Sequence, residues 1–299
     1  MGYFVQTLQH NISFSTFVSI DPTLKIPNIS IKCFGKDIRI LASSNQGILC
    51  CQRYKHRSCE YFVCKPSTGQ YAVLPSPNGK KRFFELVALM ILKSNPLHYK
   101  IIKYSDARHS PSNKNNYICE IFDSKIWSWR QTENLITERS TIFDHQSPVC
   151  TGGLVYWLTN RNTILIFDSA TETHLEFAGP LAATEENRSY MYERIVEYKG
   201  RLGFICKYKS DELVLWGLED RTNYRWEIKR IVGIDKEKNR LIGCNLADMA
   251  LMLGYRDQVY AQSGFYNPRD IFPFQSNSEP MDLEDGCMLS CLEEMMNDC

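Results

Sequence analysis

The feature that most constrains the fold is a pattern of short apolar runs separated by turn residues. In residues 47–75 three such runs are rich in the aromatic and β-branched side chains that favour strands. The runs are Gly47–Tyr54, Tyr61–Cys64 and Tyr71–Pro75. Pro66 fixes its own φ and Gly69 can adopt a positive φ, so residues 66–69 can close a tight hairpin. The stretch therefore predicts an antiparallel meander.

The same plan of strand, turn and strand recurs in three later segments, 99–129, 152–180 and 201–226. The corresponding strand ends are spaced by 58, 45 and 49 residues; they are Cys64, Phe122, Phe167 and Trp216. Repeats of roughly 40–50 residues that each contain several antiparallel strands are typical of β-propeller blades. We therefore predict an all-β fold, a β-propeller-like (kelch-type) array of antiparallel blades.

Two details indicate how these strands pack. In Thr163–Asp168 apolar side chains point to both sides, which predicts a strand covered on both faces, as in the middle of a blade. Trp127 and Trp129 stand two residues apart and are expected to point the same way. We favour core packing over a ligand platform for this pair, because hydrophobic strands are the usual surroundings of tryptophan.

Two segments depart from the repeated plan. Ser105–Asn116 is rich in Ser and Asn and predicts a polar loop, which is one candidate partner contact and equally an idle surface loop. Residues 275–299 contain seven acidic residues and no Lys or Arg, which predicts a flexible acidic C-terminal tail. A short helix in this tail stays open, because some of its apolar residues have rough helical spacing: Met288, Leu289, Leu292, Met295 and Met296.

Charge and composition argue against several classes of protein. Lys plus Arg total 35 and Asp plus Glu total 34, so the broad positive field of a nucleic-acid-binding protein is missing. The run Lys80-Lys81-Arg82 is interpreted as a solvated turn. Residues 1–20 lack a signal-peptide pattern, and the longest apolar run, Leu86–Leu92, is too short to span a membrane. We expect a reduced, soluble protein of the cytoplasm or nucleus that binds neither nucleic acid nor membranes.

The residues that carry catalytic or metal chemistry do not form a recognisable set. Six His are scattered, and Cys287 and Cys291 supply only one half of a zinc-type spacing. Cys50 and Cys51 lie in an expected strand, where at least one faces inward and packs as a small hydrophobe. Four carboxylates fall at expected turns and are interpreted as turn caps, not as a glycosidase pair: Asp168, Glu172, Asp211 and Glu212. We therefore predict no enzyme, no catalytic, cofactor-binding or metal residues, and no cofactor.

The chain resembles the F-box-associated domain of plant F-box proteins over roughly residues 4–272. The first match is Gly47-Ile-Leu-Cys50, followed by Lys65-Pro-Ser-Thr-Gly69 and then Leu74-Pro75. Further matches follow in the family's order: Tyr99-Lys-Ile-Ile102, Gly153–Leu158 and Ile164–Asp168. The resemblance implies a β-propeller that recognises substrates for an SCF-type ubiquitin ligase and binds client proteins through its loops.

The family places a helical F-box ahead of this domain, and residues 1–45 supply neither its Leu-Pro start nor its Cys-Lys-Ser-Trp-like end. We expect a linker and first strands in residues 1–40, the propeller domain in 41–272 and a disordered acidic tail in 273–299. A Skp-type adaptor and a cullin are expected partners only if an F-box is present upstream. Two alternatives stay open: a stand-alone protein-interaction module without a ligase role, and a propeller enzyme of the glycosidase or lyase type.

Overall fold

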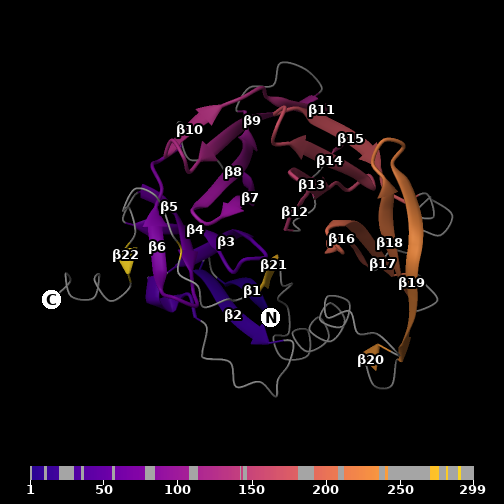
Figure 1. The fold of residues 1–299 in the computed structure, drawn as a ribbon, viewed down its shortest axis with the longest axis horizontal. Coiled ribbons are helices and arrows are strands. Elements are labelled where there is room, and N and C mark those ends of the chain that lie inside the picture. The colour runs from indigo at the N-terminus through magenta and orange to yellow at the C-terminus, as the bar shows by residue number, and fades with distance from the viewer. Residues whose placement is uncertain are drawn as a thin grey trace. The chain divides into compact units, whose positions relative to one another are not determined.

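The structure, a computed structural model, describes residues 2–9, 12–19, 30–34, 37–55, 58–77, 85–107, 114–141, 143, 147–180, 192–207, 212–235, 240–241, 270–275, 281 and 289–290. Within these ranges the elements are β-strands, apart from one 3-10 turn at Lys32–Phe34. The strands form antiparallel sheets, so the predicted all-β fold is confirmed (Figure 1). The chain divides into unit 1 (Met1–Ser140 with Arg269–Cys299) and unit 2 (Thr141–Pro268).

The first sheet of unit 1 joins segments from the two ends of the chain. β1 (Gly2–Gln9) pairs with β2 (Ile12–Ser19) on one side and with β21 (Asp270–Phe274) on the other. The rings of Phe4, Phe17 and Phe274 pack together with centroids 5.1–5.8 Å apart. β1 and β2 thus lie within residues 1–40 and belong to a sheet of unit 1, and β21 runs two residues past the expected boundary at 272.

The second sheet contains the meander predicted from residues 47–75. Its strand order is β22-β6-β5-β4-β3. The bounds are β3 Ile38–Ser43, β4 Leu49–Lys55, β5 Ser58–Lys65, β6 Gln70–Val73 and β22 Leu289–Ser290. The backbone N–H groups of Thr68 and Gly69 donate to the carbonyl of Lys65 at 3.1 and 3.0 Å, and Gly69 has a φ of 71°. The predicted hairpin at 66–69 is therefore confirmed.

The third sheet completes unit 1. Its order is β10-β9-β8-β7, and β11 pairs with the first part of β9. The bounds are β7 Glu85–Ser94, β8 Leu97–Asp106, β9 Lys114–Asp123, β10 Ser128–Gln131 and β11 Leu135–Glu138. An apolar cluster shared by the second and third sheets includes Val63, Leu89 and Ile101, and another shared by the first and second sheets includes Phe4 and Phe62.

The described residues of unit 2 form two antiparallel sheets. The first has the order β12-β13-β14-β15, with bounds Val149–Thr151, Leu154–Leu158, Thr163–Asp168 and His174–Ala178. The second has the order β16-β17-β18-β19-β20, with bounds Tyr192–Tyr198, Arg201–Lys207, Glu212–Asp220, Arg225–Asp235 and Arg240–Leu241. β14 lies between two strands and Ile164–Phe167 are all buried, which confirms the prediction of a strand covered on both faces.

Parts of the segment expected to be a flexible tail lie against unit 1. Phe274 and Met281 are buried, and Leu289–Ser290 form a short strand where a helix had been left open. The cause is tertiary: unit 1 offers an apolar core and a strand edge, which a short tail segment lacks by itself. Residues 276–280, 282–288 and 291–299 lie outside the described residues.

Candidate functional site

Unit 1 contains a cluster of charged side chains that is almost closed to solvent. Lys103 on β8 donates from Nζ to Glu120 Oε2 at 3.0 Å and lies 3.6 Å from Glu85 Oε1. The three side chains are only 6%, 4% and 9% exposed. Lys103 and Glu120 stand directly opposite each other on β8 and β9, so the register of the sheet fixes this pair.

The neighbouring sheet supplies the other half of the cluster. The hydroxyl of Tyr61 on β5 lies 2.8 and 2.7 Å from the two Glu85 oxygens and donates to this carboxylate. Burial, followed by the negative charge of Glu85, raises the pKa of Tyr61, so its hydroxyl keeps the proton that it donates. Lys103 Nζ also lies 5.5 Å from the centroid of the Tyr61 ring. Because these groups satisfy one another, the cluster joins two sheets and leaves little surface for a substrate.

The two adjacent cysteines of β4 also serve packing. Both are fully buried, Cys50 in the cluster between the second and third sheets and Cys51 in the cluster on the opposite face. Burial, followed by the nearby Cys51 and Glu85, raises the pKa of the Cys50 thiol well above its usual value. Such a thiol is a poor nucleophile at neutral pH, in agreement with the predicted packing role.

Trp127 and Trp129 pack in the core, as predicted. Both rings contact Phe122, with centroids 5.3 and 5.5 Å away, and the indole N–H of Trp129 donates to the carbonyl of Pro75 at 2.7 Å. The expected geometry differs, because Trp127 has a φ of 49° and precedes β10, so the two residues do not belong to one extended strand.

Asp168 and Glu172 lie at a turn, as expected, whereas Glu212 lies in a strand and not at a turn. Asp168 Oδ1 accepts the backbone N–H of Ala170 at 2.8 Å, and Glu172 has a φ of 57° in the same turn. Both therefore support the connection between β14 and β15. Glu212 begins β18 and is exposed, whereas Asp211 lies outside the described residues.

The predicted loop at Ser105–Asn116 is shorter than expected. Ser105 and Asp106 end β8, Lys114–Asn116 begin β9, and the N–H of Ala107 donates to the carbonyl of Asn116 at 2.8 Å. Pairing with β7 and β11 satisfies the backbone of these polar residues, which their composition alone did not indicate. Residues 108–113 lie outside the described residues, as does the basic run at 80–82.

An exposed apolar surface that the sequence analysis missed lies on β19 of unit 2. Ile228 and Ile231 are 50% and 55% exposed. They are three residues apart, a spacing that places side chains on opposite faces of a regular strand. A register shift at Lys229 places both side chains on the same face of the sheet. Ile228 pairs with Trp216 and Ile231 pairs with Val214, and these two partners are two residues apart on β18. We call these two residues the β19 apolar ledge.

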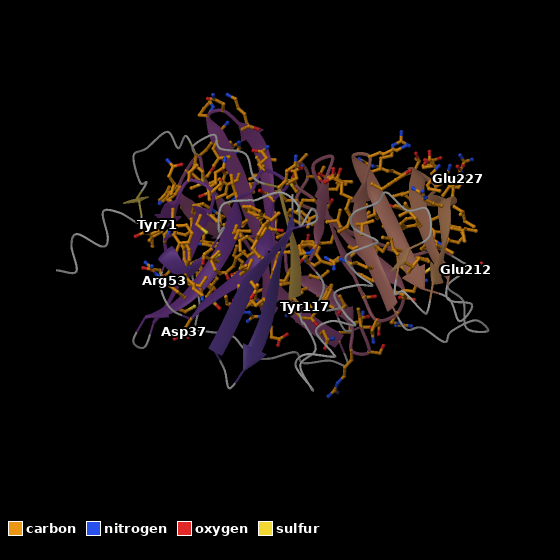
Figure 2. All side chains as sticks on the ribbon, turned by 90° about the horizontal axis from the view of Figure 1, so that it is seen from below. Asp37, Arg53, Tyr71, Tyr117, Glu212 and Glu227 are labelled. Carbon is orange, nitrogen blue, oxygen red and sulfur yellow. The ribbon has the colours of Figure 1, made fainter. Side chains whose placement is uncertain are left out.

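The opposite side of this strand carries paired charges. Lys229 Nζ lies 2.6 Å from Glu219 Oε1 and 3.2 Å from Glu227 Oε2, and Arg201 lies 3.1 Å from Glu219. The hydrogen bond from Lys229 lowers the pKa of Glu219, and the same bond raises the pKa of Lys229. Glu227 and Glu212 are labelled on this unit in Figure 2. β19 thus separates an apolar face from a charged one.

The described residues contain neither a metal-binding cluster nor a membrane-spanning helix. Among the described residues, no group of three or more His, Cys, Asp or Glu is arranged to hold a metal ion. Cys287 and Cys291 lie outside those ranges. None of the described helical residues forms a helix that is long and apolar enough to cross a bilayer.

Antiparallel sheets that pack through apolar faces define an all-β scaffold of the blade type. The family of the F-box associated beta propeller domain matches residues 3–277, and the chain belongs to this family. The matched range includes β1 and β21, which confirms that the N-terminal strands and the strand ending at Phe274 are parts of the domain.

The relatives are F-box proteins of Arabidopsis thaliana. One is 29% identical over 155 residues, which is 48% of this chain and 42% of the relative. A second is 41% identical over 68 residues, which is 21% of this chain and 35% of the relative. A third, named a putative F-box protein, is 25% identical over 211 residues, which is 65% of this chain and 48% of the relative. The chain thus matches less than half the length of these curated relatives. A solved structure, apo AztD from Citrobacter koseri, aligns with a TM-score of 0.33 and 10% identity over 76% of this chain and 70% of that chain, which is too weak to carry an argument.

Proposed function

We propose that this chain is the substrate-recognition part of an SCF-type ubiquitin ligase subunit and binds client proteins in the cytoplasm or nucleus. The observation that carries the proposal is the match of the F-box associated beta propeller domain to residues 3–277. F-box proteins make up the relatives reported above, which supports the same role. In this role the chain binds a client, and other subunits carry out the ubiquitin transfer.

The structure offers one candidate client contact, the β19 apolar ledge. Exposed apolar surface on a folded domain is typical of protein-binding sites. Ile228 and Ile231 provide the apolar part, whereas the paired charges of Glu219 and Lys229 lie on the opposite face of β19.

The contact is tested by capture with matched variants. The chain with Ile228→Glu and Ile231→Glu is compared with the wild type and with Ile126→Glu, which changes an isoleucine of unit 1 that is 61% exposed. We expect at least tenfold less capture of specific clients by the ledge variant and unchanged capture by Ile126→Glu, measured by quantitative mass spectrometry. Equal capture by all three proteins contradicts the assignment of the ledge.

The ligase role needs a separate test. β1 and β2 are strands of a domain sheet, so these two elements do not present the helical surface that an F-box uses for its adaptor. We therefore expect residues 1–299 alone to show no micromolar binding to a Skp-type adaptor by calorimetry, and an F-box fused ahead of Met1 to restore it. With cullin and RING subunits added, the fusion should ubiquitylate a captured client. Client binding without ubiquitylation by the fusion favours the stand-alone interaction module.

A further inference from the structure

Two residues of the C-terminal segment, Leu289 and Ser290, lie along the outer edge of the second sheet. Among the described strands, β22 is the one that pairs with β6 on the side away from β5. Leu289 lies opposite Tyr71, and Ser290 lies opposite Gln70. Figure 1 shows the short yellow β22 beside β6, and Figure 2 labels Tyr71 close to it. A segment more than 200 residues away in sequence therefore pairs with a strand edge of the N-terminal meander.

The register explains why this edge accepts a strand. The N–H of Leu74 donates to the carbonyl of Tyr61 at 2.9 Å, which makes Phe62 and Val73 a pair that does not exchange hydrogen bonds. Antiparallel pairs alternate, so Tyr71, two residues earlier, also directs its N–H and C=O away from β5. Those two groups face the side on which Leu289 lies.

A second contact fixes the segment eight residues ahead of β22. Met281 is 5% exposed and belongs to the apolar cluster between the second and third sheets. Its backbone N–H donates to Gln70 Oε1 at 2.8 Å, and Thr68 Oγ1 lies 2.9 Å from the same oxygen. Gln70 therefore meets the segment twice, through its side chain at Met281 and through its backbone position opposite Ser290.

Charge complementarity also favours this docking. Seven of the 34 acidic residues lie in residues 276–299, which contain no Lys or Arg and so carry a charge of −7. The remaining 27 acidic and all 35 basic residues leave residues 1–275 with +8. Opposite net charges on a tail and its domain raise the local concentration of the tail at the domain surface.

We propose that the outer edge of β6 is a strand-docking site, and that the chain's own segment Met281–Ser290 occupies it in cis. The segment covers this edge and so competes with other proteins for it. The competing partner is an extended acidic segment in which an apolar anchor residue precedes a short strand, as Met281 precedes β22 in this chain. This inference does not depend on the ubiquitin-ligase role, and its test measures peptide binding, not client capture.

The experiment uses the full chain and a fluorescent peptide of residues 276–299. Met281→Asp places a carboxylate in the apolar slot and should release the segment. We expect the peptide to bind this variant at least tenfold more tightly than the wild type by fluorescence anisotropy, and a peptide of scrambled sequence to bind neither. Equal binding to both proteins, or no binding to a folded Met281→Asp variant, overturns the proposal.

A second pair of variants tests docking of the segment on the edge of β6 if Met281→Asp fails to fold. Gln70→Ala removes the acceptor for Met281 N–H, whereas Gln131→Ala changes an exposed glutamine of β10 that bonds to Asn134. Hydrogen exchange at the Tyr71 amide should be at least tenfold faster in Gln70→Ala and unchanged in Gln131→Ala. Unchanged exchange at Tyr71 in Gln70→Ala also overturns the proposal.

Discussion

The side-chain amide of Gln6 bonds to both backbone polar groups of Ile40. The N–H of Ile40 donates to Gln6 Oε1 at 2.7 Å, and Gln6 Nε2 donates to the carbonyl of Ile40 at 3.3 Å. β3 is the last strand of its sheet, so these groups of Ile40 lie on a side that no strand of that sheet covers. Gln6 supplies the missing partners from β1 and connects the first sheet of unit 1 to the second.

Replacing Gln6 by leucine should therefore destabilise unit 1. The substitution leaves the buried N–H and C=O of Ile40 without partners, which costs about 1–3 kcal/mol. Gln46→Leu is the control, because Gln46 bonds to Ser94 at the surface and its loss should stay within about 0.5 kcal/mol. Urea unfolding followed by circular dichroism measures both changes, and equal losses contradict the role assigned to Gln6.

The buried charge cluster predicts a large difference between two lysines. Lys103→Met leaves Glu85 and Glu120 buried without their cation, so we expect a loss of about 3–5 kcal/mol in the free energy of unfolding. Lys114 forms an exposed pair with Glu138 at 4.0 Å, and Lys114→Met should cost at most about 1 kcal/mol. Denaturant titration of the two variants checks this, and a loss below 1 kcal/mol for Lys103→Met would show that the cluster contributes little.

The hairpin glycine predicts a cost from backbone strain alone. Gly69 has a φ of 71°, and a Cβ added there meets no atom within 4 Å. Gly69→Ala should destabilise by about 1–2 kcal/mol, because an L-residue pays to adopt the left-handed conformation, whereas Gly69→Asn should cost less. Gly233→Ala is the matched control, since that site is equally open and has no positive φ. Thermal unfolding that is identical for Gly69→Ala and Gly233→Ala rules out the strain.

The charged face of β19 predicts a specific dependence on pH. The hydrogen bond from Lys229 lowers the pKa of Glu219 below its ordinary value of 4.5. A carboxylate whose pKa is lower in the folded state stabilises the fold above pH 4.5, and this contribution is lost as the pH falls through the folded pKa. NMR titration should find the pKa of the Glu219 carboxyl below 4.5 in the wild type. In Lys229→Met this pKa should be higher than in the wild type. An unchanged Glu219 pKa in that variant contradicts the pairing.

The local elements were predictable because their signals are local. The meander at 47–75, the hairpin at Pro66–Gly69 and the doubly covered strand at Thr163–Asp168 follow from β-propensity, alternation and turn chemistry, which act over a few residues. The burial of at least one of Cys50 and Cys51 followed from their place in a strand, and the structure buries both because apolar clusters cover both faces of the sheet. The order of the family motifs also predicted the family, which the match over residues 3–277 confirmed.

Other features were missed because neighbours in space decide them. Nothing within Ile228–Ile231 shows that a register shift against β18 places both isoleucines on one exposed face. Lys103, Glu85 and Glu120 are unremarkable in the sequence, and only strand pairing brings their charges together. The polar residues at Lys114–Asn116 resembled a loop, and pairing with β11 made them a strand.

The sequence by itself thus determined the strands, the tight turns and the all-β class, since each depends on side chains within one short window. Tertiary structure alone decided how the ends of the chain are used: β1 pairs with β21, and Leu289 lies beside Tyr71. Pairs separated by more than 200 residues leave no local pattern, because backbone hydrogen bonds join any two strands of suitable register. Their stability comes from edges and apolar slots that exist only after the sheets have assembled.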